Sequence, residues 1–156
     1  MFVRKPVPGD GNNIYNVIIS ATEALENEPK YKFWLDTLYA QEVVETRILS
    51  EHVFIAAGKE GQVVGSAFLN PTTGYFSGWY VKPGFHNKGL GVKLLDAVLS
   101  AADSNTRIYC SVRKQYRKPI SILERYNFTV IEDDLDGTFF PHSEWFIMKT
   151  PEFGTT

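Results

Sequence analysis

The feature that constrains the fold most is a pair of glycines placed where a strand meets a helix. Residues 75–81 are apolar and aromatic and predict a strand, because Gly74 precedes them and Pro83-Gly84 follows them. The segment His86-Asn87-Lys88-Gly89-Leu90-Gly91 comes next, and apolar residues then recur at helical spacing: Leu90, Leu94, Leu95, Val98 and Ala101. Glycine lets a backbone approach a ligand closely, and the first N–H groups of a helix point outward as donors. This arrangement favours an anion, most naturally a phosphate or pyrophosphate.

The spacing of the glycines excludes two common phosphate-binding motifs. Gly84 and Gly89 have the separation of a Walker A loop, but Leu90-Gly91 replaces its Lys-Ser/Thr pair. The run from Gly89 to Leu94 lacks the third glycine of a dinucleotide fingerprint, and no acidic residue stands at the ribose-binding distance. A glycine pair that serves only as a tight connection between strand and helix remains the plain alternative.

Composition and charge narrow the class of protein. With 156 residues, of which 44% are hydrophobic and 14% aromatic, the chain is expected to form one domain with its own core. A net charge of −2 provides no basic field for nucleic acid, so no nucleic-acid partner is expected. Cys110 is the only cysteine, which excludes an internal disulfide and a cysteine-based zinc site. The N-terminal residues form no apolar leader and no stretch approaches a membrane span, so we expect a cytoplasmic protein without a membrane partner.

Periodicity along the chain predicts alternating strands and helices. Polar residues 10–13 offer helix caps, Pro119 opens the last helix in its first turn, and Asn127 suits the left-handed position after it. The turn 58–61 joins two strands. The predicted strands are 2–4, 53–57, 63–69, 75–81, 107–112, 128–131 and 144–148, and the predicted helices begin near residues 14, 31, 90 and 119, the second of them running to about residue 49. The order is therefore β-α-α-β-β-β-α-β-α-β-β.

This order and the glycine segment together resemble the GCN5-related N-acetyltransferase (GNAT) superfamily. The superfamily's acetyl-CoA loop is matched by Val81, Pro83, Phe85, Gly89, Gly91, Leu94 and Leu95. Smaller similarities are Val64-Gly65, Arg4 with Asp10 and Ile14, and Glu124, Arg125 and Phe128 of the segment 123–128. His86 departs from the pattern, because the superfamily usually has Gln or Arg there. The resemblance implies one α/β (α+β) acetyltransferase domain over residues 1–156. Its central sheet would be mixed, mostly antiparallel and of about seven strands, with four flanking helices.

The resemblance also implies a reaction and a binding site. The expected reaction is direct transfer of an acetyl group from acetyl-CoA, the cosubstrate, to a primary amine of a small molecule or peptide, with no metal. The expected cofactor-binding residues are Trp79, Tyr80, Val81, His86, Asn87, Lys88, Gly89, Leu90, Gly91 and Val92. Pyrophosphate would lie on the N–H groups of residues 88–92, with Lys88 or Lys93 reaching a phosphate, and the pantetheine arm would pair with residues 79–81. A bulge at Gly78 would let a backbone N–H near Tyr80 polarise the thioester carbonyl.

The proton-transfer residues are where the sequence departs from the superfamily. Leu123 stands where many members have the tyrosine that protonates the thiolate, and Tyr116 stands where an asparagine is usual. Tyr126 follows Leu123 by three residues and could substitute, although it could equally pack beside Phe128. A thiol ionises near pH 8.5, so the thiolate can also leave without an acid. Candidate bases are Tyr75, Ser77, Glu42, Glu45, His142 and Glu144, whereas Cys110 fits the core better than a nucleophile.

The acceptor and the partners are left open by the sequence. The acidic segment 132–137 is either an attractor for a cationic amine or a solvated loop, and 139–141 lines a pocket or closes the core. A CoA-binding module that has lost catalysis and senses acyl-CoA is one alternative, and a structural domain whose glycine loop is only a turn is another. A homodimer, paired through the terminal aromatic strand, remains open.

Overall fold

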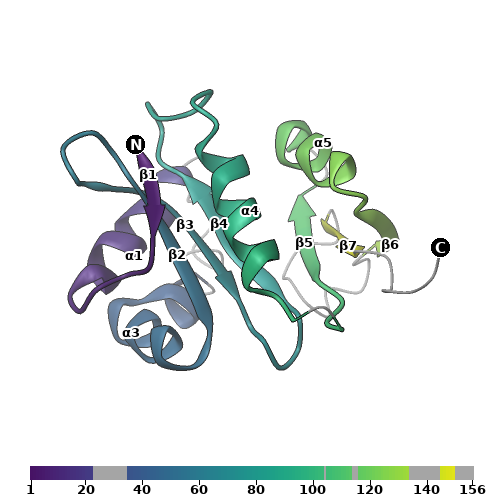
Figure 1. Cartoon of the computed structure of the whole chain (residues 1–156), viewed down its shortest axis with the longest axis horizontal. Helices are drawn as coiled ribbons and strands as arrows, with labels where there is room; N and C mark the ends of the chain where they lie inside the picture. Colours follow the sequence, from purple (N-terminus) through teal and green to yellow (C-terminus); the bar gives the residue numbers. More distant parts are fainter. Residues whose placement is uncertain (23–34, 104, 114–115, 134–144, 150–156) are drawn as a thin grey trace. The chain divides into compact units, whose positions relative to one another are not determined.

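The computed structural model describes residues 1–22, 35–103, 105–113, 116–133 and 145–149. The chain divides into two compact units: Met1–Asn70 with Gly78–Ala101, and Pro71–Ser77 with Ala102–Thr156. The elements of the first part of the chain are β1 (Phe2–Arg4), α1 (Asp10–Ala21), α3 (Gln41–Ser50), β2 (His52–Ala57), β3 (Val63–Leu69), β4 (Phe76–Val81) and α4 (Leu90–Ala101). Those that follow are β5 (Tyr109–Arg113), α5 (Arg117–Arg125), β6 (Thr129–Asp133) and β7 (Trp145–Lys149) (Figure 1). Among the described residues these elements follow the predicted order of strands and helices, except that a separate helical stretch at residues 35–39 precedes α3.

The sheet of the first unit has the strand order β1-β2-β3-β4. Its β1–β2 and β2–β3 pairs are antiparallel, and the β2–β3 turn closes as predicted, with the Gly58 N–H bonded to the Gln62 carbonyl at 2.8 Å. All residues of β3 after the first are buried, which is typical of a strand covered on both faces. An ideal Cβ on Gly65 would lie 3.1 Å from Leu94 of α4, whereas the Phe68 ring packs against Tyr39, which precedes α3. Because Gly65 and Phe68 point to opposite faces, α4 covers one face and the α3 region covers the other.

The start of α1 is built differently from the prediction. No side chain caps this helix, and the position before it is Gly9 in a left-handed conformation (φ 97°). Asp10 is used instead to hold β1 to α1: one carboxylate oxygen accepts from Arg4 at 2.9 Å and from the Val7 N–H at 2.8 Å. The Gly11 N–H donates to Glu45 of α3 at 3.1 Å, so a residue far along the chain satisfies this helix end.

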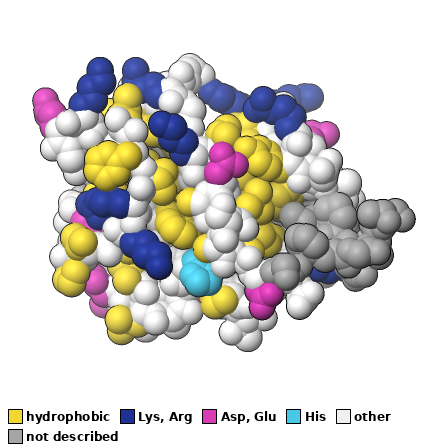
Figure 2. Space-filling view, in the orientation of Figure 1, with side chains coloured by type: hydrophobic (Ala, Val, Ile, Leu, Met, Phe, Trp, Pro, Cys, Tyr) yellow, Lys and Arg dark blue, Asp and Glu magenta, His cyan; other side chains and the backbone are white. Residues whose placement is uncertain are grey.

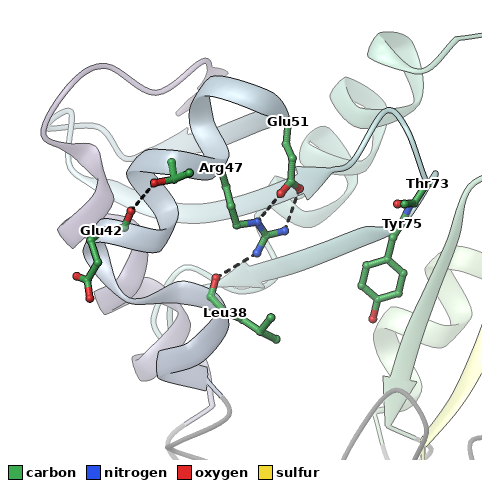
Figure 3. A network of polar contacts seen from close by, with 7 residues as sticks. Leu38, Glu42, Arg47, Glu51, Thr73 and Tyr75 are labelled. Atoms are coloured by element: carbon green, nitrogen blue, oxygen red, sulfur yellow. Dashed lines mark hydrogen bonds and ion pairs between the residues drawn. The ribbon is translucent and has the colours of Figure 1, made fainter.

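The single helix predicted over residues 31–49 is wrong as one element. Residues 35–39 are helical, Ala40 is extended (φ −54°, ψ 152°), and α3 begins anew at Gln41, while residues 31–34 lie outside the described residues. Arg47 joins the two pieces, since it pairs with Glu51 at 2.6 Å and donates to the Leu38 carbonyl at 3.3 Å (Figure 3). Burial by itself lowers the pKa of Arg47, but the hydrogen bond and charge of Glu51 and the interaction with Tyr39 together outweigh it, so the pKa lies above the ordinary value. A guanidinium that is permanently charged therefore fixes this junction.

The second unit contains an antiparallel sheet of order β5-β7-β6. Tyr75 forms an isolated parallel bridge to Tyr109 at the start of β5. The helix α5 has Pro119 in its first turn, and Asn127 after it is left-handed (φ 67°), as predicted. The expected seven strands are thus present among the described residues, but their ladders form groups of four and three instead of one continuous sheet.

Candidate functional site

The connection between β4 and α4 folds as a loop with three left-handed residues. The Phe85 N–H bonds to the Lys82 carbonyl at 3.1 Å and closes a first turn. Gly84 (φ 93°), Asn87 (φ 63°) and Gly89 (φ 76°) then take the left-handed conformation and turn the chain. Glycine and asparagine adopt this conformation more readily than other residues. The first helical bond runs from the Lys93 N–H to the Gly89 carbonyl at 3.1 Å. The N–H groups of residues 90–92 therefore precede the helical ladder and face outward from the helix start.

The surface around this helix start is open and basic. Leu90 is buried and anchors the helix, whereas residues 86–89 are exposed, and an ideal Cβ on Gly89 would meet nothing within 4 Å. The segment 82–95 carries three lysines and no carboxylate. Figure 2 shows Lys and Arg side chains gathered at the end of the first unit where Figure 1 draws this loop. Outward N–H groups, the helix dipole and the lysines all favour an anion here.

Two side chains tie the loop to the strand. The Trp79 indole N–H donates to the Gly91 carbonyl at 2.9 Å, and an ideal Cβ on Gly91 would lie 3.9 Å from the indole ring. The His86 ring lies 2.8 Å from the Val81 carbonyl through Nε2, so this nitrogen carries the proton that is donated. The helix start and the last residues of β4 are thereby held in one fixed arrangement.

The backbone of β4 presents alternate residues to its two edges. The Lys82 N–H bonds to the Val64 carbonyl at 2.7 Å, and the Tyr80 carbonyl lies 3.2 Å from an ideal Cβ on Gly65, so both residues face β3. In a regular strand the N–H and C=O of a residue share one edge, and neighbouring residues use the opposite edge. Trp79 and Val81 therefore direct their backbone groups away from β3, while the predicted donor, the Tyr80 N–H, lies on the β3 side.

Gly78 is the irregular residue of β4. Its φ is 62°, and an ideal Cβ there would clash with the Phe68 ring and lie 3.1 Å from Tyr39. Its carbonyl accepts a hydrogen bond from the Ser66 hydroxyl at 2.8 Å. The sequence predicted an irregularity at Gly78 but not the part played by Ser66. The available signal was a single hydroxyl in the otherwise apolar strand 63–69.

The candidate proton-transfer residues have separate environments. Leu123 is completely buried, Tyr116 precedes α5 as its cap residue, and Tyr126 follows α5 half-buried, with its N–H 3.0 Å from the Leu123 carbonyl. The Tyr75 hydroxyl donates to Ser111 at 3.4 Å. Cys110 is buried, and burial raises the pKa of its thiol to about 12, which agrees with a core role.

The remaining candidates are charged residues. Glu45 is engaged with Gly11, whereas Glu42 is exposed beside an open cleft of about 500 Å³ that Tyr15 and Asp36 also line. His142, Glu144 and residues 134–141 lie outside the described residues. Within the described part of the chain, His, Cys, Asp and Glu form no group of three suited to a metal, and no helix is long and apolar enough to cross a membrane.

Known proteins match this chain in sequence profile and in structure. The profile of the acetyltransferase (GNAT) family matches residues 17–128. A GNAT-family acetyltransferase from Staphylococcus aureus Mu50 superposes with a TM-score of 0.74 at 16% identity, over 95% of this chain and 96% of that one. The PaiA N-acetyltransferase from Thermoplasma acidophilum, solved in complex with coenzyme A, gives 0.72 at 19% identity, over 95% and 96%. A GCN5-related N-acetyltransferase structure from Rhodopseudomonas palustris gives 0.75 at 16%, over 95% and 93%. No curated protein matches the sequence significantly.

Proposed function

The chain belongs to the acetyltransferase (GNAT) family, and from that premise we propose that it transfers an acetyl group from acetyl-CoA to a primary amine of a small molecule or peptide. The observation that carries this proposal is the open start of α4, where outward N–H groups, left-handed Gly89 and three nearby lysines form a site suited to pyrophosphate. We also propose that residues 1–156 act as one acetyltransferase domain.

The coenzyme would bind along the loop and the adjoining strand. Its pyrophosphate would accept from the N–H groups of residues 88–92, with Lys88 or Lys93 adding charge. His86 and Asn87 would shape the loop, the former through its bond to the Val81 carbonyl. The amides of the pantetheine arm would pair with the edge of β4 that faces away from β3, as an added strand does. Trp79 and Val81 would thus supply the backbone contacts, since the backbone groups of Tyr80 between them face β3, and the loop would supply the phosphate contacts.

Carbonyl polarisation would come from the same strand edge. An acyl transfer passes through a tetrahedral oxyanion, which a fixed N–H donor stabilises. Since Tyr80 faces β3, the N–H of Trp79 or Val81 is better directed than that of Tyr80 toward a ligand on the outer edge. Trp79 is the preferred donor because its indole is already fixed to α4. Acetyl transfer then consists of attack by the neutral amine on the polarised carbonyl, loss of the thiolate of CoA and loss of one amine proton.

The leaving thiolate would be protonated by Tyr126 or by water. Leu123 carries no hydroxyl and is buried, so it cannot serve. General acid catalysis supplies about 10²- to 10⁴-fold, whereas positioning and polarisation contribute as much or more. An enzyme without the usual tyrosine would therefore be slower but still active.

A second candidate function is a CoA-binding module that senses acyl-CoA without turnover. Leu123 at the acid position favours it, because the usual proton donor is replaced by a buried apolar side chain. Binding of acetyl-CoA together with no release of free thiol against a broad panel of amines would identify this function.

The experiment that tests the proposal is a calorimetric titration of the purified protein with acetyl-CoA, compared between wild type, Gly89→Glu and Gly61→Glu. Gly61 (φ 82°) is a matched control, because it is also left-handed and its Cβ would also meet open space. Both variants carry similar backbone strain and the same added charge. We expect saturable binding that is lost in Gly89→Glu and kept in Gly61→Glu, followed by thiol release with at least one amine. Absence of binding by the wild type would overturn the proposal.

A further inference from the structure

Ser66 is the one buried polar side chain that links two strands of the described residues. Three polar or charged residues are buried there: Asp10, Thr22 and Ser66. Asp10 pairs with Arg4, and Thr22 bonds within its own helix to the Ile18 carbonyl at 2.7 Å. Ser66, in β3, is fully buried and donates across to the Gly78 carbonyl in β4 at 2.8 Å. A buried hydroxyl without a hydrogen bond destabilises the folded state. The bond between Ser66 and the Gly78 carbonyl therefore holds both groups in place.

The hydrogen bond from Ser66 is made to the irregular residue of β4. Gly78 is left-handed, so it departs from the strand conformation that a regular ladder would impose. Glycine crosses between conformations more easily than other residues, so a hydrogen bond to the peptide that joins Gly78 to Trp79 helps to determine the direction of that peptide. The Ser66 hydroxyl holds the carbonyl end of this peptide.

The direction of one end of a peptide determines the direction of the other. No cis peptide bond occurs among the described residues, and in a trans peptide the C=O and N–H point in opposite directions. With the Gly78 carbonyl drawn toward Ser66 in β3, the Trp79 N–H points away from β3. This is the same N–H that is best placed to polarise a thioester on the outer edge of β4.

Resting on the proposed acetyl transfer, we propose that Ser66 is a positioning residue: its hydroxyl holds the Gly78–Trp79 peptide so that the Trp79 N–H is directed at the thioester oxygen of acetyl-CoA. The carbonyl end is held by Ser66, and the Trp79 side chain is held by the Gly91 carbonyl at 2.9 Å. The donor is therefore fixed before the ligand arrives, which is what makes an oxyanion donor effective.

Packing around Gly78 keeps this bond free of water. The Phe68 ring and Tyr39 lie against Gly78, and the Arg47 guanidinium stacks over the Phe68 ring, 4.3 Å from its centre. Glu51 and the Leu38 carbonyl in turn hold Arg47, as Figure 3 shows. A hydrogen bond in such an apolar and ordered surrounding directs its partners more strongly than one in water does.

The test is Ser66→Ala, with Thr22→Val as its matched control. Both changes remove a buried hydroxyl that donates to a backbone carbonyl at nearly the same distance, 2.8 and 2.7 Å. Ser66→Ala is expected to lower kcat at least 10-fold, as a misdirected donor should, while the affinity for free CoA changes less than about twofold. Thr22→Val is expected to lower stability by a similar amount and leave kcat unchanged. If Ser66→Ala does not fold, Ser66→Cys retains the size and a weak donor and should show the same separation to a smaller degree.

A spectroscopic measurement reports on the donor without an amine. The infrared stretch of carbonyl-labelled acetyl-CoA should fall on binding to wild type and return toward its solution value with Ser66→Ala. An unchanged stretch and kcat in Ser66→Ala, or a loss of kcat no larger than that of Thr22→Val, would overturn the inference alone. A wild type that binds no acetyl-CoA would overturn the proposed function and this inference with it.

Discussion

Replacing Gly91 by alanine should separate the binding of the coenzyme from the stability of the protein. Gly91 is the second residue of α4, and its φ is not in the left-handed region. An ideal Cβ at this position would lie 3.9 Å from the nearest atoms of the Trp79 ring, which is ordinary van der Waals contact. Alanine therefore fits the free protein without strain. Because glycine is about 1 kcal/mol less favourable than alanine within a helix, we expect the free energy of unfolding to rise by up to that amount.

The same methyl group should interfere with a phosphate bound at the helix start. It occupies the space between the first turn of α4 and the Trp79 indole, against which the ligand would lie. A phosphate oxygen displaced by about 1 Å from an N–H moves beyond hydrogen-bonding distance. Each charge-assisted hydrogen bond lost costs about 1.5–3 kcal/mol, so the affinity for acetyl-CoA should fall about 10- to 100-fold.

Calorimetric titration and thermal unfolding of the same samples measure both effects. Gly91→Ala is expected to raise Tm by about 2–4 °C while it weakens acetyl-CoA binding. Ser100→Ala is the matched control, because it also favours the helix but lies in the exposed last turn of α4. It should raise Tm slightly and leave the affinity unchanged. Wild-type affinity in Gly91→Ala would refute the placement of the phosphate, and a lower Tm would refute the account of the helix.

Three further predictions concern the core and the proton donor. The thiol of Cys110 ionises near pH 9 in the unfolded chain but only near its raised pKa of about 12 in the folded protein, so the free energy of unfolding should fall as pH rises between these values. At pH 10 this loss should be about 1.4 kcal/mol in wild type and absent in Cys110→Ala, and equal pH profiles of the two proteins in urea unfolding would contradict the prediction. Arg47→Met leaves Glu51 unpaired in a mostly buried position and should lower the free energy of unfolding by about 3 kcal/mol. The double variant Arg47→Met with Glu51→Met should lose less stability than the sum of the two single variants, and additive losses would argue against a stabilising ion pair. Tyr126→Phe should lower kcat at least about 10-fold with an unchanged KM for acetyl-CoA if Tyr126 is the acid, and an unchanged pH–rate profile would assign the proton to water.

The parts of the fold that follow from local chain chemistry were predictable from the sequence. Turn glycines, the left-handed Asn127 and the helical spacing after Gly89 each depend on neighbours a few residues away. The break at Ala40 was not predictable in this way, because the contacts around it are tertiary: Arg47 reaches the Leu38 carbonyl, Glu51 and the Phe68 ring. The prediction for the start of α1 was wrong for the same reason. Glu45 accepts from the Gly11 N–H, a donor that local capping rules assign to a neighbouring side chain.

In the candidate site, too, the features that depend on local sequence were predictable and those that depend on contacts between strands were not. Binding of a phosphate by N–H groups needs only a glycine at the right place in a strand–helix connection, and such a requirement is visible in sequence spacing. The direction of the carbonyl-polarising N–H depends instead on how β4 pairs with β3, which a sequence does not specify to the residue. The N–H of Tyr80 was predicted for this role. The hydrogen bond from the Lys82 N–H to the Val64 carbonyl indicates that Tyr80 faces β3, and therefore favours the N–H of Trp79. Ser66 has no motif at all, because its effect passes through the carbonyl of another strand. Residues that act on a backbone from a neighbouring strand are therefore where structure adds most to the interpretation of such a chain.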